Sequence, residues 1–173
     1  MTQERTGVVT FKGKPMTLVG PALKPGDKAP EFNVLGAGLT PVNLASSKGK
    51  TRLFSVVPSL DTGICSIQTK KFNEKVASLP ASVQCYTVSV DLPFAQARFC
   101  GAEKIEKMTS LSDHRDVSFG TNFGVLVKEL RLLSRSIFVV GPDDKVAYVQ
   151  IVPEITTEPN YDEALAAVKK VAK

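Results

Sequence analysis

Three cysteines are the residues best suited to chemistry in this sequence of 173 residues: Cys65, Cys85 and Cys100. Cys65 lies in the stretch PSLDTGICSIQTKKFN, residues 58–73, behind a proline, a threonine and a glycine. The thiolate is the nucleophilic form of cysteine, and it forms where positive charge or unpaired N–H groups surround the sulfur. The surroundings of each cysteine therefore decide whether it is a nucleophile or a packing residue.

Cys65 is expected in the first turn of a helix that follows a buried strand. Thr62 takes the N-cap position, and Cys65 is the third helical residue, where a capping box usually carries Glu or Gln. The unpaired N–H groups and the positive dipole end of a helix start both favour an anion. A cysteine that only fills a core has no use for the flanking Pro58 and Thr62, so this pattern favours a thiolate.

The other candidates for nucleophilic or metal chemistry are weaker. Cys85 lies inside the apolar run VQCYTVSV, where burial raises the pKa of a thiol, so a packing role is favoured. His114 is the only histidine and stands far from Cys65 in sequence, which favours a surface or strand-edge position over a Cys-His pair. The sequence has no C-x-x-C motif, which argues against a zinc site. We expect no metal and no cofactor.

Composition limits the classes of function. A chain of 173 residues with 43% hydrophobic residues predicts one domain over 1–173. The net charge of +5 is spread over runs of at most two basic residues, which argues against nucleic-acid binding. No signal peptide and no apolar run of about 20 residues is present, so we expect a cytoplasmic protein outside the membrane. Three cysteines are too few for a disulfide scaffold.

Strands and helices alternate along the chain after an opening hairpin at about residues 7–19. The other expected strands are 32–35, 51–57, 83–90 and a second hairpin over 135–152, with an irregular segment between Pro41 and Gly49. Three helices are expected. The first starts at Gly63 and stops before Pro80, the second is short, covers 93–99 and runs into a loop, and the third closes the chain over 160–173. This order predicts an α/β three-layer sandwich.

Four segments resemble, in the same order, those of the bacterial thiol peroxidases, the atypical two-cysteine branch of the peroxiredoxins. PSLDTGICSIQTKKFN resembles their active-site segment, which shares the core Pro-x-x-x-Thr-x-x-Cys. DLPFAQARFCGAEKIE is similar to the segment that holds the second cysteine, and LLSRSIFVV to the strand that carries the active-site arginine. VTFKGKPMTLVG resembles their N-terminal hairpin. The resemblance covers nearly the whole chain.

The resemblance implies a role for five residues of this sequence. Cys65 would be the peroxidatic cysteine and Cys100 the resolving cysteine, with Pro58, Thr62 and Arg135 completing the peroxide site. It also implies a thioredoxin-like fold with a central mixed β-sheet, and an antioxidant enzyme that reduces hydrogen peroxide and alkyl hydroperoxides. Cys65 would become a sulfenic acid and then an intrachain Cys65–Cys100 disulfide, which thioredoxin reduces. A homodimer is implied as well.

One position departs from the family pattern. Members often have proline directly after the threonine, whereas this chain has Gly63, which leaves the first helical turn less rigid. A disulfide needs Cα atoms within about 7 Å of each other. We therefore expect the turn around Cys65 and the segment around Cys100 to unfold locally after oxidation.

Two other classes of function share parts of this pattern. A thioredoxin-like disulfide oxidoreductase has a second cysteine three residues after the first, and here that residue is Gln68. A redox sensor or a binding protein could share the reactive Cys65 but would not need Arg135, Thr62 and Cys100 together. The sequence thus favours a peroxidase over both alternatives.

Overall fold

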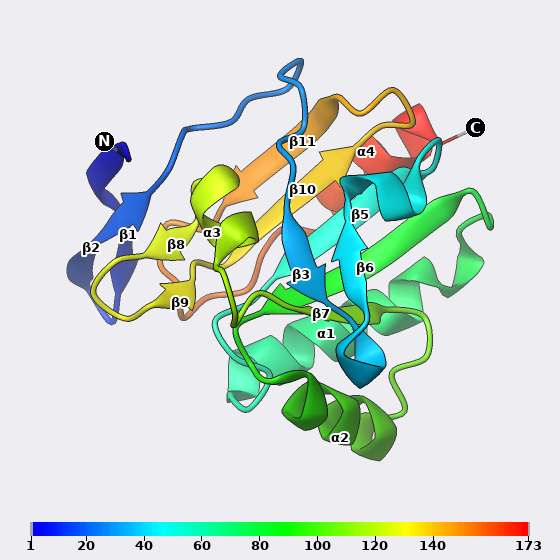
Figure 1. Ribbon diagram of the computed structural model, residues 1–173, viewed down its shortest axis with the longest axis horizontal. Coiled ribbons are helices and arrows are strands. Elements are labelled where there is room, and N and C mark those ends of the chain that lie inside the picture. Colours follow the sequence, from blue (N-terminus) through cyan, green and yellow to red (C-terminus); the bar gives the residue numbers. More distant parts are fainter. Residues whose placement is uncertain (1, 173) are drawn as a thin grey trace.

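A seven-stranded mixed sheet forms the centre of the computed structural model, which describes residues 2–172 (Figure 1). Its strands are β3 (Asn33–Leu35), β4 (Pro41–Asn43), β5 (Thr51–Val56), β6 (Val83–Ser89), β7 (Thr109–Ser112), β10 (Ser136–Val140) and β11 (Val146–Ile151). They lie in the order β11-β10-β5-β6-β7-β3-β4. Strand β6 is parallel to β5 and β7, and the other neighbouring pairs are antiparallel. The mixed central sheet implied by the resemblance is confirmed.

The N-terminal hairpin belongs to a second, smaller sheet. It consists of β1 (Glu4–Phe11) and β2 (Lys14–Val19), joined by β8 (Leu126–Val127) and β9 (Leu132–Leu133) in the order β1-β2-β8-β9. Lys12 and Gly13 in the turn have φ angles of 51° and 77°, the left-handed values that two-residue hairpin turns favour. The hairpin expected at about 7–19 is confirmed, although its first strand already begins at Glu4.

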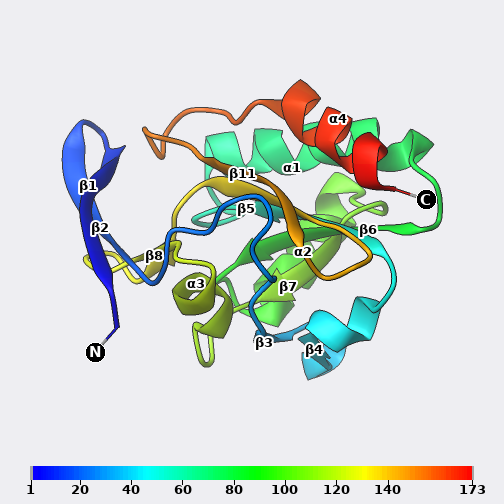
Figure 2. The ribbon, with the colours of Figure 1, turned by 90° about the horizontal axis from the view of Figure 1, so that it is seen from above.

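Helices cover both faces of the central sheet. Helices α1 (Gly63–Lys75) and α4 (Tyr161–Val171) lie on one face and α3 (Ser118–Asn122) on the other (Figure 2). Leu53 of β5 packs in one cluster with Phe72 of α1 and Val168 of α4, whereas its neighbour Phe54 packs in another with Phe119 of α3. A strand buried on both faces requires this alternation, and the predicted three-layer sandwich is confirmed. No helix described within residues 2–172 is long and apolar enough to cross a membrane.

Helix α2 (Pro93–Glu103) is longer than the sequence predicts. The prediction of a short helix that ends before Cys100 is wrong, because the helix continues through Cys100 and Gly101. A glycine inside a helix costs only about 1 kcal/mol relative to alanine, so Gly101 does not stop it. The helix ends instead at Glu103, and its C-cap residue Lys104 has a left-handed φ of 54°. Cys100 is therefore held in regular helix.

Other short elements carry no sequence signal of their own. The segment between Pro41 and Gly49, expected to be irregular, contains β4 and a short 3-10 helix, Leu44–Ser47. Helix α1 ends at Lys75 and passes into a 3-10 turn, Val76–Ser78, before Pro80. Strands β7, β8 and β9 and helix α3 were not predicted, since two to five residues are too few to show a period.

Candidate active site

Cys65 lies in the first turn of α1, directly after the buried strand β5. Thr62 is the N-cap residue with extended backbone, and its carbonyl oxygen accepts the first helical hydrogen bond from the Ser66 N–H at 3.0 Å. This confirms the predicted start of the helix. The Thr62 side chain makes no capping bond, because its hydroxyl donates to the Ser59 carbonyl oxygen at 3.0 Å. The lone pairs of that hydroxyl oxygen thus stay available as acceptors.

Arg135 places a cationic donor against the sulfur of Cys65. Its Nη2 donates to Cys65 Sγ at 3.2 Å, its Nη1 to Gln68 Oε1 at 2.6 Å, and its Nε to the Ile155 carbonyl oxygen at 2.8 Å. Gln68 is fully buried and donates in turn to Ser55 Oγ at 2.8 Å. These contacts fix the plane of the guanidinium. Negative charge on the sulfur, or on an oxygen bound beside it, is stabilised by this arrangement.

Strand register explains how residues 70 positions apart meet. Ser136 of β10 pairs with Val56 of β5, so Arg135 lies beside the chain that leaves β5 toward α1. The sequence identifies Gln68 only as the residue that stands where a C-x-x-C motif would have its second cysteine. Its spacing of three residues from Cys65 puts both side chains on one face of α1, and that spacing is the signal that could have identified it.

A mainly apolar cavity of about 450 Å³ lies at the start of α1. Pro58, Thr62 and Arg135 line it, whereas Cys65 has no exposed surface of its own. The apolar part of its wall consists of Phe11, Ile64, Ile67, Leu132 and Ile155. The structure therefore brings three of the five predicted site residues to one cavity, and a fourth, Cys65, lies behind its wall in contact with Arg135.

The N-terminal hairpin forms part of that cavity wall, and Glu154 fastens it there. Glu154 Oε2 accepts hydrogen bonds from Thr10 Oγ1 at 2.7 Å and the Gly13 N–H at 3.0 Å. Its Oε1 accepts from the Lys12 N–H at 3.0 Å and from the N–H and hydroxyl of Thr156 at 3.1 and 2.7 Å. These hydrogen bonds, led by that from Thr10, hold the pKa of Glu154 well below its usual range.

A Glu154→Gln variant should have a lower melting temperature than the wild type near neutral pH, by a few degrees. Because the pKa of Glu154 is lower in the folded state, its contribution is present above the ordinary value of 4.5 and declines as the pH falls below it. The difference between the two proteins should therefore shrink in acid. Thermal unfolding at several pH values measures it, with the exposed Glu31→Gln as control; a difference that widens in acid would contradict the assignment.

No disulfide joins Cys100 to Cys65, because all three cysteines are free within residues 2–172. The half-buried Cys100 Sγ lies 2.9 Å from Ser110 Oγ, and burial raises the pKa of this thiol. Its side chain packs with the apolar cluster of Ile105 and Met108, whereas Cys65 packs in a separate cluster. A bond between the two sulfurs thus requires one of the two helices to move.

Cys85 and His114 lie where the sequence places them. Cys85 is buried in β6, and burial raises its pKa to about 12, so it remains a thiol near neutral pH. This confirms its packing role. His114 lies two residues beyond β7, half-buried, with Nδ1 at 3.0 Å from Ser112 Oγ. That is a strand-edge position, as expected.

Comparison with known proteins gives consistent matches over most of the chain. The model of the Redoxin family matches residues 24–165. The thiol peroxidase of Halalkalibacterium halodurans is 56% identical over 161 residues, covering 93% of this chain and 96% of that protein. The thiol peroxidase of Bacillus subtilis is 54% identical over 165 residues, covering 95% and 98%.

Solved structures agree with this result. A peroxiredoxin-like protein from Aquifex aeolicus superposes with a TM-score of 0.89 at 45% identity, covering 98% of both chains. The thiol peroxidase from Chromobacterium violaceum gives a TM-score of 0.84 at 18% identity, covering 94% of this chain and 95% of that one. The second likeness concerns the fold alone.

Proposed function

Because the chain belongs to the Redoxin family and to its thiol peroxidases, we propose that it reduces hydrogen peroxide and alkyl hydroperoxides with the Cys65 thiolate. The observation that carries this proposal is the hydrogen bond from Arg135 Nη2 to Cys65 Sγ at the start of α1. A helix N-terminus and a buried guanidinium meet there at one sulfur. Such a sulfur is suited to attack an electrophilic oxygen.

In the first step of the reaction, each residue around the cavity has its own role. The Cys65 thiolate attacks the terminal peroxide oxygen, so that an S–O bond forms while the O–O bond breaks. The departing oxygen leaves with the electron pair and takes up a proton, giving an alcohol or water and a Cys65 sulfenic acid. Arg135 stabilises the charge on that oxygen. Thr62 Oγ1, whose own proton goes to Ser59, accepts a hydrogen bond from the peroxide O–H and orients it.

Pro58 completes the peroxide site. It is buried at the cavity wall and has no N–H to offer, so it shields the sulfur from water. The apolar side chains around the rest of the cavity support alkyl hydroperoxides as well as hydrogen peroxide as substrates.

The second half of the cycle returns Cys65 to the thiolate. The Cys100 thiolate attacks the sulfenic sulfur, an S–S bond forms, and the oxygen leaves as water once protonated. Thioredoxin then reduces the Cys65–Cys100 disulfide by thiol–disulfide exchange in the cytoplasm. Membership of the family supports this reductant and also a homodimer as the working form.

A disulfide map tests the proposed cycle directly. The reduced protein receives one equivalent of peroxide and is digested under conditions that trap thiols. We expect a Cys65–Cys100 bridge within one chain with Cys85 free, and continuous peroxide consumption once thioredoxin, its reductase and NADPH are added. A bridge to Cys85 would overturn the assignment of the resolving residue. Oxidation that occurs once and stops would support a redox sensor instead.

An Arg135→Lys variant should oxidise Cys65 about a hundredfold more slowly, the loss typical when one donor to a developing charge is removed. A lysine ammonium cannot reproduce the planar fork that binds Cys65, Gln68 and Ile155 together. Stopped-flow measurement of the second-order rate constant with hydrogen peroxide tests this. The exposed Arg98→Lys serves as the matched control, and equal rates for both variants would contradict the role of Arg135.

A further inference from the structure

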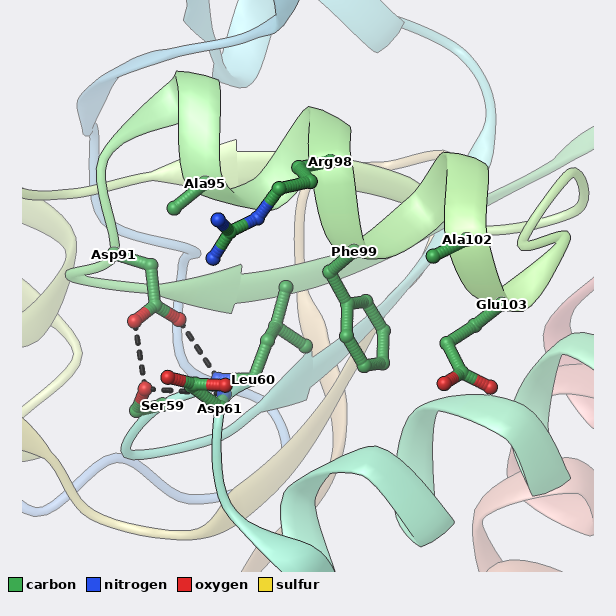
Figure 3. Close-up of a pocket in the computed structure, with 9 residues that line it drawn as sticks. All are labelled: Ser59, Leu60, Asp61, Asp91, Ala95, Arg98, Phe99, Ala102 and Glu103. Atoms are coloured by element: carbon green, nitrogen blue, oxygen red, sulfur yellow. Dashed lines mark hydrogen bonds between the residues drawn. The ribbon is translucent and has the colours of Figure 1, made fainter.

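Asp91 connects the loop that precedes Cys65 to the end of β6 (Figure 3). Its Oδ1 accepts a hydrogen bond from Ser59 Oγ at 2.7 Å, and its Oδ2 accepts from the Leu60 N–H at 2.8 Å. A third bond comes from Ser89 Oγ, the last residue of β6, to Oδ2 at 2.7 Å. One carboxylate therefore holds two consecutive residues of the loop against the sheet.

The two loop residues held by Asp91 contact residues of the peroxide site. The Ser59 carbonyl oxygen accepts the Thr62 hydroxyl proton, which leaves the Thr62 oxygen facing the peroxide as an acceptor. Leu60 is buried and packs directly in the cluster of Cys65. Displacing the loop from Asp91 would therefore move both the orienting hydroxyl and the packing beneath the sulfur.

The same hydrogen-bond chain continues into helix α2. Gln96 of α2 is buried, and its Nε2 donates to Ser89 Oγ at 3.0 Å and to the Leu111 carbonyl oxygen at 2.9 Å. Gln96 lies one helical turn before Cys100. A continuous path thus runs from Ser59 through Asp91 and Ser89 to the helix that carries Cys100.

Helix α2 faces the loop with one side and holds the thiol of Cys100 on another. Phe99 and Glu103 line a cleft of about 380 Å³ between α2 and loop residues 59–61, and Figure 3 shows both pointing toward α1. Cys100 lines a different cavity, together with Gln96. If α2 is the helix that turns or unwinds to bring the Cys100 sulfur to Cys65, that motion breaks the contact of Gln96 with Ser89.

We propose that Asp91 is a positioning residue that ties the loop before Cys65 to the helix of Cys100. The peroxide site is assembled while α2 is docked, and the release of α2 after oxidation loosens the loop so that both segments open together. This inference rests on the proposed function. The Cys65 sulfenic acid can either form the disulfide or be oxidised further by a second peroxide. In this proposal, Asp91 affects how much of the sulfenic acid follows each of these two reactions.

The test compares Asp91→Ala, Asp91→Asn and Ser59→Ala with an Asp61→Asn control. Asp61 lines the same cleft, and its carboxylate makes no hydrogen bond or ion pair within residues 2–172. Stopped-flow kinetics gives the rates of Cys65 oxidation and of disulfide formation, and mass spectrometry gives the fraction of sulfinic acid at fixed peroxide. Hydrogen exchange of the reduced protein reports on residues 57–62 and 93–103.

Asp91→Ala should oxidise Cys65 about tenfold more slowly, the effect of losing hydrogen bonds to a charged group. It should form the disulfide faster and collect less sulfinic acid, with Asp91→Asn and Ser59→Ala intermediate and Asp61→Asn unchanged. A residue that merely stabilises the fold would leave the partition between disulfide and sulfinic acid unmoved. If Asp91→Ala fails to fold, the two milder variants decide the question.

An unchanged partition in all three variants would overturn the role of Asp91. So would hydrogen exchange that rises in only one of the two segments, because the proposal requires both to loosen together. A failure of the proposed function would give a different result, because the wild type itself would then form no sulfenic acid. Hydrogen exchange of the reduced Asp91 variants would still rise in residues 57–62 and 93–103.

Discussion

Replacing Cys65 with serine is expected to reduce peroxide turnover to the background of the reaction without enzyme. The serine hydroxyl has nearly the shape of the thiol, so the contact with Arg135 and the start of α1 should persist. A hydroxyl, however, stays protonated near neutral pH and is a weak nucleophile without an adjacent base. The single histidine, His114, lies beyond β7, where its Nδ1 contacts Ser112 Oγ.

The matched control for this variant is Cys85→Ser. Both changes replace a buried thiol with a hydroxyl, and they differ in whether the sulfur faces Arg135 or the core of the sheet. Burial raises the pKa of Cys85 to about 12, so this residue supplies no thiolate near neutral pH. Activity per folded molecule should remain close to that of the wild type, even if stability falls by about 1–3 kcal/mol from burying a hydroxyl. Comparable losses of activity in both variants would refute the assignment of Cys65.

The position of Cys65 could be predicted because every signal for it is local. The apolar run of β5, the proline that ends it and the N-cap threonine all lie within fifteen residues of the cysteine. The alternation of strands and helices along the chain, around one buried strand, likewise predicts the three layers of the fold. Periodicity and capping act through near neighbours in sequence, so one chain is enough to recognise them.

Local signals do not identify Arg135 as a partner of Cys65, and only the resemblance to the thiol peroxidases implies it. Arg135 reaches the sulfur only through the register of β10 on β5, and Gln68 gains its role only once Arg135 is in place. Asp91 opens the segment that resembles the one holding the family's second cysteine, but its contacts with Ser59 and Leu60 join residues more than thirty positions apart. Long-range hydrogen bonds of this kind leave no period in the sequence.

The extent of α2 was misjudged for a related reason. Gly101 suggested the end of a helix, yet Gln96 docks the helix by donating two buried hydrogen bonds, to Ser89 of β6 and to Leu111 of β7. Tertiary contacts of this kind outweigh the weak preference of one glycine. In the proposed cycle, Cys100 starts in an ordered helix, so a disulfide with Cys65 would require part of that structure to be lost.

Replacing Cys100 with serine should leave the first step intact and stop the cycle after it. The reduced variant is expected to consume one peroxide per chain at the wild-type rate, because Arg135, Thr62 and Pro58 are unchanged around the sulfur of Cys65. With no resolving thiol, the sulfenic acid persists and a second peroxide converts it to the sulfinic acid, which thioredoxin does not reduce. Quenched-flow mass spectrometry should therefore show a burst of one equivalent, then a slow rise of sulfinic acid.

A second variant on the same contact separates the loss of the thiol from a disturbance of α2. Ser110→Ala removes the hydroxyl that lies 2.9 Å from Cys100 Sγ but keeps the thiol, so it should still form the disulfide and turn over. It should do so at least as fast as the wild type, because one contact that holds Cys100 in its docked position is gone.

Sustained turnover by Cys100→Ser with thioredoxin would contradict the two-cysteine cycle, since the reductant would then act on the Cys65 sulfenic acid directly.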